Sequence, residues 1–445
     1  MPMPSGPGNP GPAEARPPAG ASRPEPIPGP RRSVEGRPGE GTGGHPGEGT
    51  GYRAVFAVKE FRAVFAAHLM SMLGEVVCAI ALSVLIYRLT GSPLMSALAF
   101  ALALLPYMIG GTLLSAVADR YPARRVLVVC DLLSAVCTAA MVVPGMPVAA
   151  LLALRCVAAA VSPVFSGTRA ATLGDILGEG DLFVLGRSVI RITAQSAQLV
   201  GFAVGGLLLS VVAPRAVLVI TAAAFVGSAL VLRLGTRRRP ARGGAGSGGA
   251  LLGESLRVVR RLLAHRRIRA LLLLSWVPPM FVVAPEALAT PYADDLGLGP
   301  AGLGLLMIAM PVGAIASEVL VGSCLSPRAR AALTLPVAVA AMLPALAYLF
   351  RPSLPWALLC LLLAGCGSSY TLGLDQWFIA AVPEEERGRA MTVLTAGLMT
   401  TQGLGMALAG AAAEFAPVHH VIMGAGVLGT VSALVVAAEA RRTAR

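Results

Sequence analysis

Long apolar stretches separated by short polar turns run from about Phe61 to about Ala438. An apolar run of about twenty residues is long enough to cross the hydrocarbon core of a bilayer as a helix. The pattern therefore predicts an all-α polytopic membrane protein with about twelve transmembrane helices. We place these spans at residues 61–89, 93–117, 126–145, 148–170, 188–211, 214–234, 269–291, 300–322, 331–350, 354–378, 390–414 and 418–438.

Arginine is concentrated in every second turn between these spans. The arginine-rich set comprises the turns with Arg120, Arg124 and Arg125, Arg187, Arg237–Arg239, Arg257–Arg269, Arg328 and Arg330, Arg387 and Arg389, and Arg441 and Arg442. The other set holds only Arg88, Arg215 and Arg351. Because arginine and lysine collect in cytoplasmic loops, the pattern predicts a plasma-membrane protein whose N- and C-termini both face the cytoplasm.

The spans fall into two halves that resemble each other. Gly201 and Gly206 match Gly405 and Gly410 at a constant spacing of 204 residues. Repeated halves of this kind build transporters whose substrate site lies between the repeats. The predicted organisation is a disordered, Pro/Gly-rich cytoplasmic tail (1–55), an N-terminal six-helix half (56–234), a cytoplasmic linker with a basic amphipathic segment (235–268), a C-terminal six-helix half (269–438) and a short cytoplasmic tail (439–445).

Composition narrows the functional classes. Of the 445 residues, 56% are hydrophobic, which leaves no room for a separate catalytic domain. The net charge of +13 is explained by the arginine turns, so we expect no nucleic-acid partner. The seven cysteines form no CxxC pair. No catalytic constellation, cofactor-binding motif or metal-ligand spacing is visible, so we expect neither an enzyme nor a resident cofactor or metal.

Three turns carry a family resemblance. They read Ala-Asp-Arg-Tyr-Pro-Ala-Arg-Arg-Val-Leu at 118–127, Tyr-Arg-Leu-Thr-Gly-Ser-Pro-Leu at 87–94 and Pro-Glu-Glu-Glu-Arg-Gly-Arg-Ala at 383–390. The first resembles the cytoplasmic signature of the major facilitator superfamily, in the variant of the macrolide-efflux and enterobactin-exporter branch. The resemblance covers about residues 60 to 440 and implies two six-helix halves that rock around a central cavity.

Ionisable side chains within the spans are costly to bury and are therefore candidate functional groups. Glu75 lies near the middle of the first span, too far from either end to reach the membrane surface. It is a candidate coupling carboxylate or cation-binding group, or else a structural partner of Arg155. Arg155 lies in the fourth span, where the resemblance implies a coupling arginine. It is a candidate to hold an anionic substrate or to form a static pair.

The second half holds two further candidates. Glu286 follows Pro285 near the outer end of the seventh span, and we expect Pro278 and Pro279 to break the same helix at mid-depth. Asp375, near a cytoplasmic helix end, is a candidate for the cavity floor. For Glu286 the alternative is an interfacial carboxylate.

The arginine-rich turn after the second span is a candidate cytoplasmic gate. Asp131 lies seven residues beyond Arg124 and returns to nearly the same helical face. We expect Asp119, Arg120, Arg124, Arg125 and Asp131 to form charge pairs that latch the two halves in the outward-facing state. The alternative is a turn that only sets topology.

Together these features predict a secondary active transporter, a proton-coupled exporter of small amphipathic molecules, either drugs or natural products. The expected partners are a small-molecule substrate, protons and the lipid bilayer, and we expect a monomer. One alternative is an exporter of an endogenous siderophore-like metabolite. The other is a scaffold or sensor that retains the fold and transports nothing.

Overall fold

The computed structural model describes residues 52–106, 120–178, 181–239 and 259–443. Within these ranges the chain forms helices and no β-strand, as predicted. Nine helical segments of this described part have the length and hydropathy to cross a membrane, and α3 is a shorter apolar helix. Large apolar side chains stay exposed on their outer faces, including Val211, Leu234 and Val435, as lipid contact requires.

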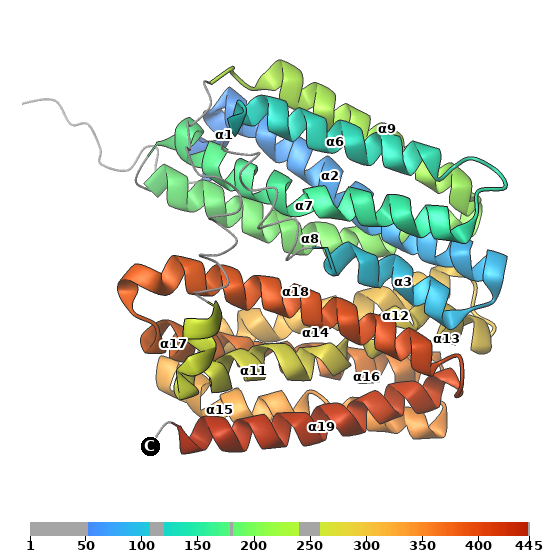
Figure 1. Ribbon diagram of the computed structural model, residues 1–445, viewed down its shortest axis with the longest axis vertical. Coiled ribbons are helices and arrows are strands. Elements are labelled where there is room, and N and C mark those ends of the chain that lie inside the picture. The colour runs from blue at the N-terminus through green and yellow to red at the C-terminus, as the bar shows by residue number, and fades with distance from the viewer. Residues whose placement is uncertain (1–51, 107–119, 179–180, 240–258, 444–445) are drawn as a thin grey trace, which may run out of the picture. The chain divides into compact units, whose positions relative to one another are not determined.

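The N-terminal half contains α1 (Tyr52–Ala57), α2 (Lys59–Thr90), α3 (Pro93–Leu104), α6 (Ala123–Ala140), α7 (Val148–Leu177), α8 (Asp181–Val211) and α9 (Pro214–Gly235). These helices form the upper bundle in Figure 1. α2 ends at Gly91, whose positive φ lets its N–H reach the Tyr87 carbonyl. The helices follow the predicted spans closely, but the second span ends in residues outside the described ranges. Residues 52–55 of the predicted tail belong to α1, and residues 1–51 lie outside the described ranges.

The C-terminal half contains α11 (Arg266–Val282), α12 (Ala284–Ala287), α13 (Ala289–Asp295), α14 (Pro300–Cys324), α15 (Pro327–Ala340), η1 (Leu343–Phe350), α16 (Leu354–Cys366), η2 (Gly367–Ser369), α17 (Tyr370–Ala381), η3 (Glu384–Glu386), α18 (Arg387–Ala412) and α19 (Val418–Arg442). It is the lower bundle in Figure 1. The predicted break at Pro278 and Pro279 is wrong, because α11 continues to Val282. The break falls just before Pro285, which lacks an N–H and whose ring would clash with the Phe281 carbonyl.

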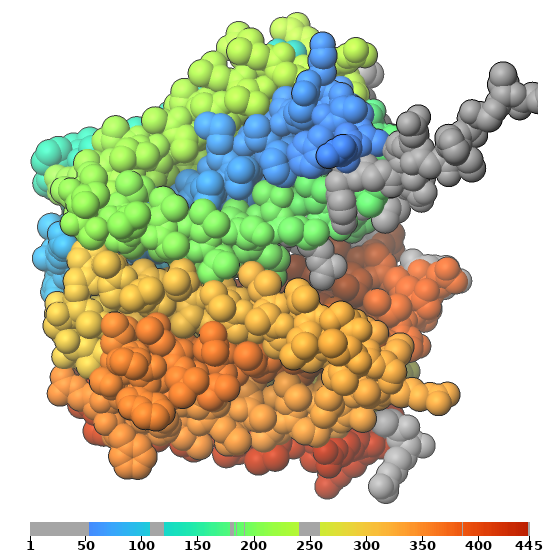
Figure 2. All heavy atoms as spheres, turned by 180° about the vertical axis from the view of Figure 1, so that it is seen from behind, coloured from blue at the N-terminus to red at the C-terminus, as the bar shows by residue number. Residues whose placement is uncertain are grey.

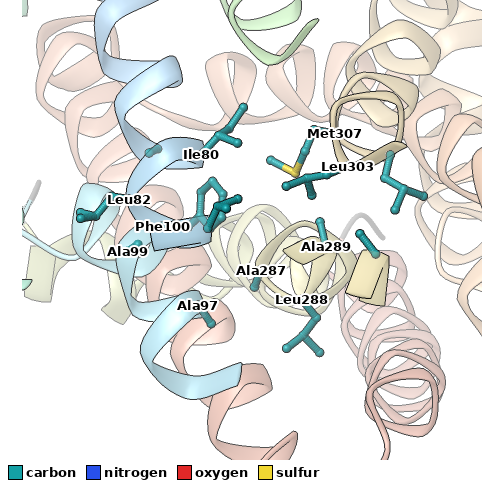
Figure 3. Packing of buried hydrophobic residues seen from close by; sticks show 14 of the residues in the cluster. Ile80, Leu82, Ala97, Ala99, Phe100, Ala287, Leu288, Ala289, Leu303 and Met307 are labelled. Atoms are coloured by element: carbon teal, nitrogen blue, oxygen red, sulfur yellow. The ribbon is translucent and has the colours of Figure 1, made fainter. Parts of the chain in front are cut away.

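A single hydrophobic cluster joins the two halves at one end of the bundle, which we call the closed end. This is the end at which α2 ends and α3 begins. Figure 3 shows Ile80 and Phe100 of the first half facing Leu303 and Met307 of the second. Toward the opposite end, each half has a separate cluster of its own, one around Leu127 and Leu173 and the other around Leu271 and Leu374.

Two of the repeated glycines, Gly206 and Gly410, lie in equivalent places at the interface between the halves. A Cβ on Gly206 of α8 would lie 2.5 Å from the Cα of Gly304 on α14. A Cβ on Gly410 of α18 would lie 3.0 Å from the Cα of Leu94 on α3. Each glycine therefore lets its helix approach the opposite half backbone to backbone. Figure 2 shows α8 and α14 side by side along this junction.

Candidate functional site

Glu75 and Arg155 form an ion pair inside the N-terminal half. The Arg155 Nη2 lies 3.7 Å from the Glu75 Oε1, linking α7 to α2. The Arg155 Nε also donates to the Ala99 carbonyl of α3 at 3.4 Å. The Arg155 side chain is 4% exposed and that of Glu75 is 26% exposed. The arginine is therefore fixed by three helices, whereas the carboxylate keeps access to its surroundings.

A small polar cavity adjoins this pair. Glu75, Arg155, Asp131, Ser71 and Thr138 line it together with apolar neighbours, so α2, α6 and α7 all contribute. Its volume is about 30 Å³, which is room for one or two water molecules. A cavity of this size admits water and protons but no drug-sized cargo. The site in the first half is therefore large enough for a proton and its water molecules and too small for cargo.

Asp131 lies in this site rather than on the surface. It is 3% exposed. Its Oδ1 accepts a hydrogen bond from the Ser71 hydroxyl at 2.6 Å, and its Oδ2 accepts one from the Ser228 hydroxyl at 2.5 Å. Both serines belong to the same half as Asp131, so in this conformation the carboxylate is engaged away from the interface between the halves.

The other predicted gate residues lie near the end opposite the closed end. Arg124 donates from Nη1 to the Thr236 carbonyl at 3.1 Å and so caps α9 within the N-terminal half. Arg120 and Arg125 are exposed. Asp119 lies outside the described residues. The gate therefore stays a prediction about the other conformation.

Sequence analysis missed a second arginine on α7, the half-buried Arg169. Its Nη1 contacts the Nδ1 of His68, which is fully buried on α2, and its guanidinium lies 5.6 Å from the centre of the Phe165 ring. Its spacing was a usable signal, because Arg155, Ser162 and Arg169 recur every seven residues on one face of α7.

Glu286 and Asp375 do not line the cavity beside Glu75. Glu286 lies half-buried on α12, which packs against α18 and against α3 of the other half. Asp375 lies half-buried on α17. The four predicted coupling or substrate residues therefore occupy three places, and only Glu75 and Arg155 are brought together.

Polar contacts also join the halves at the closed end. The hydroxyls of Ser83 on α2 and Thr290 on α13 are 2.9 Å apart and buried. Nearby, the Tyr87 hydroxyl donates to Asp294 over a longer 3.5 Å. A shallow pocket of about 90 Å³ lies around Tyr87 and Asp294. These contacts add directional bonds to the hydrophobic cluster.

Glu414 makes a third contact between the halves. Its Oε1 accepts a hydrogen bond from the Ser92 hydroxyl at 2.5 Å and another from the Leu94 N–H at 3.0 Å. Those donors lie at the N-terminus of α3, where a negative charge is stabilised by the helix dipole. The Ser92 hydroxyl and the Leu94 N–H hold the pKa of Glu414 below its usual range.

Solved transporter structures share this fold at low sequence identity. A POT family transporter in complex with a thioalcohol-conjugated peptide is 11% identical with a TM-score of 0.67, over 86% of this chain and 96% of that one. A mutant of the nucleoside transporter NupG is 15% identical with a TM-score of 0.64, over 86% and 99% of the two chains. A bacterial homologue of the iron transporter ferroportin, in its inward-facing state, is 16% identical with a TM-score of 0.62, over 85% and 98%.

The comparison with curated proteins found no match. The family model described as Major Facilitator Superfamily matches residues 64–379 and 287–444, which together span both halves. Helix order, paired halves and sequence thus agree on a membrane transporter rather than an enzyme. The chain belongs to the major facilitator superfamily.

Proposed function

We propose that this protein is a proton-coupled exporter of small amphipathic molecules that works by alternating access. The observation that carries the proposal is the Glu75–Arg155 pair beside a water-sized cavity within the membrane-spanning part of the first half. A carboxylate that is partly exposed and held by a fixed arginine can bind and release a proton as its surroundings change.

The conformation supports alternating access. The cluster of Figure 3 and the contacts of Ser83, Tyr87 and Glu414 close one end of the interface between the halves. The positive-inside pattern assigns that end to the outside of the cell. On this assignment the carrier faces inward and is ready to take cargo from the cytoplasm. Both termini then lie on the cytoplasmic side of the plasma membrane.

Protons are the favoured coupling ion because carboxylates and hydroxyls surround a cavity that has room for one or two water molecules. A structural neighbour with the same fold comes from a study of proton dependent oligopeptide transporters, with a TM-score of 0.60 and 14% identity. The direction of transport rests on the resemblance to the macrolide-efflux and enterobactin-exporter branch.

The surroundings of Arg155 bear on whether the cargo is a siderophore-like anion or a neutral or cationic amphipathic molecule. A siderophore-like anion would need an unpaired cation in its path. Arg155 is buried, and its charge is paired with Glu75. This arrangement favours amphipathic molecules that are neutral or cationic over an anionic metabolite.

Transport into inside-out vesicles with an imposed proton gradient tests the proposal. Fluorescent lipophilic cations, macrolide-like compounds and a siderophore-like anion would be offered to the natural chain and to Glu75→Gln. Asp295→Asn is the matched control, because it removes one carboxylate from the exposed C-terminal end of α13. We expect gradient-driven uptake of cations or macrolides, lost in Glu75→Gln and kept in Asp295→Asn.

Equal uptake by the natural chain and Glu75→Gln would remove Glu75 from the coupling role. Uptake of the anion alone would favour the siderophore-like alternative. Failure to move any compound or any proton would favour a scaffold or sensor and contradict the proposal.

A further inference from the structure

A polar stripe runs through the N-terminal half and extends beyond the Glu75–Arg155 pair. On α2, His68, Ser71 and Glu75 are spaced by three and four residues and so share one helix face. Ser71 and Glu75 both line the small cavity, and so does Asp131. The stripe therefore brings a second carboxyl group to the same water-sized space as the first.

Asp131 has unusual partners for a buried acid. Each carboxylate oxygen accepts one hydroxyl, from Ser71 at 2.6 Å and from Ser228 at 2.5 Å, and the two hydroxyl oxygens are 3.1 Å apart. A buried charge is costly unless it is paired and hydrogen-bonded. Neutral hydroxyl donors stabilise the carboxylate, yet the same oxygens can accept a proton from a protonated carboxyl. The group can therefore exist in both protonation states without moving its neighbours.

Other charged and titratable groups surround this carboxyl. α2 contributes Glu75 and His68, and α7 contributes Arg155 and Arg169. The facing part of α9 contributes the Ser228 hydroxyl. Arg169 limits the cost of a carboxylate here, while Glu75 opposes a second negative charge. Protonation of one acid is therefore linked to the state of the other.

We propose that Asp131, held between Ser71 and Ser228, is a second proton-binding site that exchanges its proton with Glu75 through the small cavity. The step balances as a relay. A protonated Glu75 gives its proton to a cavity water, that water gives one to the Ser71 oxygen, and the Ser71 hydroxyl proton passes to the Asp131 Oδ1. One proton moves in total, and every intermediate oxygen recovers its starting protonation.

The geometry favours a proton over a metal cation as the ligand. The oxygens of Asp131, Ser71 and Ser228 stand 2.5–3.1 Å apart, at hydrogen-bond separations. Neighbouring oxygens around an octahedral Mg²⁺ ion stand about 2.9 Å apart, so the 2.5 and 2.6 Å separations of Asp131 from its two serines are those of hydrogen bonds. The proposal deepens the proposed function by naming a second group on the proton path, within one half and apart from the interface where cargo is expected to bind.

Infrared difference spectroscopy on the purified full-length protein in lipid bilayers tests the proposal without any cargo. Spectra taken across a pH titration show the carbonyl stretch of each carboxyl group as it becomes protonated. In the natural chain we expect one carboxyl band from Glu75 and one from Asp131. Asp131→Asn removes one band, and Glu75→Gln removes the other and changes the pH midpoint of the Asp131 band. Asp295→Asn serves as the control and alters neither.

Ser228→Ala is a second variant for the case in which Asp131→Asn misfolds. It keeps the Asp131 carboxyl group and removes one of its two hydrogen-bond donors. We expect it to shift the Asp131 band to higher frequency, since a hydrogen bond to a carbonyl weakens its stretch. An Asp131 band that never titrates would overturn the proposal. So would a midpoint unaffected by Glu75→Gln, or a band that responds to sodium chloride instead of pH. Two linked bands without uptake of any compound would uphold this site while contradicting the exporter.

Discussion

The carboxylate of Glu414, in the turn after α18, accepts a hydrogen bond from the Ser92 hydroxyl at the start of α3, 2.5 Å away. These residues are 322 positions apart and belong to opposite halves. The contact places an anion at a helix N-terminus, where orphan N–H groups need acceptors. Closure of this end therefore has an electrostatic part in addition to the hydrophobic cluster.

Glu414→Gln should weaken that closure. The loss of a charge at an exposed helix N-terminus predicts a shift of about two- to fivefold in the ratio of closed to open conformers at this end. Distances between spin labels placed across the closed end measure the ratio. Glu384→Gln, in η3 on the arginine-rich side, is the control and should leave the ratio unchanged.

The same contact predicts a pH dependence with a defined sign. The pKa of Glu414 is lowered in the closed state from an ordinary value of about 4.5. The stabilisation is therefore complete above that ordinary value and is lost as pH falls below it through the lowered pKa. Spin-label distances should stay constant at neutral pH and broaden only under acid. Broadening at neutral pH would contradict the assignment.

Gly206→Ala should force the halves apart at the closed end. The added methyl would lie 2.5 Å from the Gly304 Cα and 3.0 Å from its N, and neither backbone atom can give way. We expect a loss of about 1–3 kcal/mol in the free energy of closure, as for overpacked interiors. Gly424→Ala is the matched control, because nothing lies within 4 Å of its Cβ. Equal melting temperatures and label distances in the two variants would refute this steric account.

Arg155→Met should destabilise the protein mainly by leaving Glu75 unpaired. A fully buried pair costs about 3–5 kcal/mol to break, but Glu75 is 26% exposed, so we expect about 1–3 kcal/mol. The double variant Arg155→Met with Glu75→Gln should recover part of that loss. Thermal unfolding of all four members of this cycle measures the coupling between the two side chains. Strictly additive losses would show that the pair contributes nothing beyond its separate contacts.

The variant Glu286→Gln tests whether proton coupling is located in the N-terminal or the C-terminal half. Glu286 lies on α12, which packs against α3 of the other half, and it does not line the cavity beside Glu75. If coupling resides in the N-terminal half, this variant should change the apparent affinity for cargo and keep the proton dependence of transport. Initial uptake rates over a range of cargo and proton concentrations distinguish the two effects. Loss of proton dependence would move the coupling site to the second half.

Sequence periodicity predicted helix positions well because apolar length is set by the bilayer. Span 214–234 became Pro214–Gly235, and span 300–322 became Pro300–Cys324. α7 runs to Leu177, beyond its predicted end at 170, because Thr168 and Thr172 are buried within the half although they lower the local hydropathy. Residues inside a bundle are polar where they meet polar neighbours, so hydropathy alone ends such a helix too early.

The site was predicted less completely than the helices. The face shared by Glu75 and Ser71 can be read from spacing along α2. The meeting of Ser71, Asp131 and Ser228 depends on which helices are neighbours, over separations of 60 and 97 residues. Asp131 was therefore assigned to the gate on the strength of its arginine-rich turn. The sequence shows that Asp131 follows a turn rich in arginine. It does not show whether the Asp131 side chain points toward those arginines or into the interior of the N-terminal half.

The backbone contact between Gly206 and Gly304 has a kinetic consequence. Side chains that interlock must change rotamer before two surfaces can turn against each other, and glycines have no rotamers. The point of contact between Gly206 and Gly304 therefore adds no rotamer barrier to rotation of one half on the other. The time that the carrier spends in each orientation is then governed by the hydrogen bonds and side chains around this contact rather than by the contact itself.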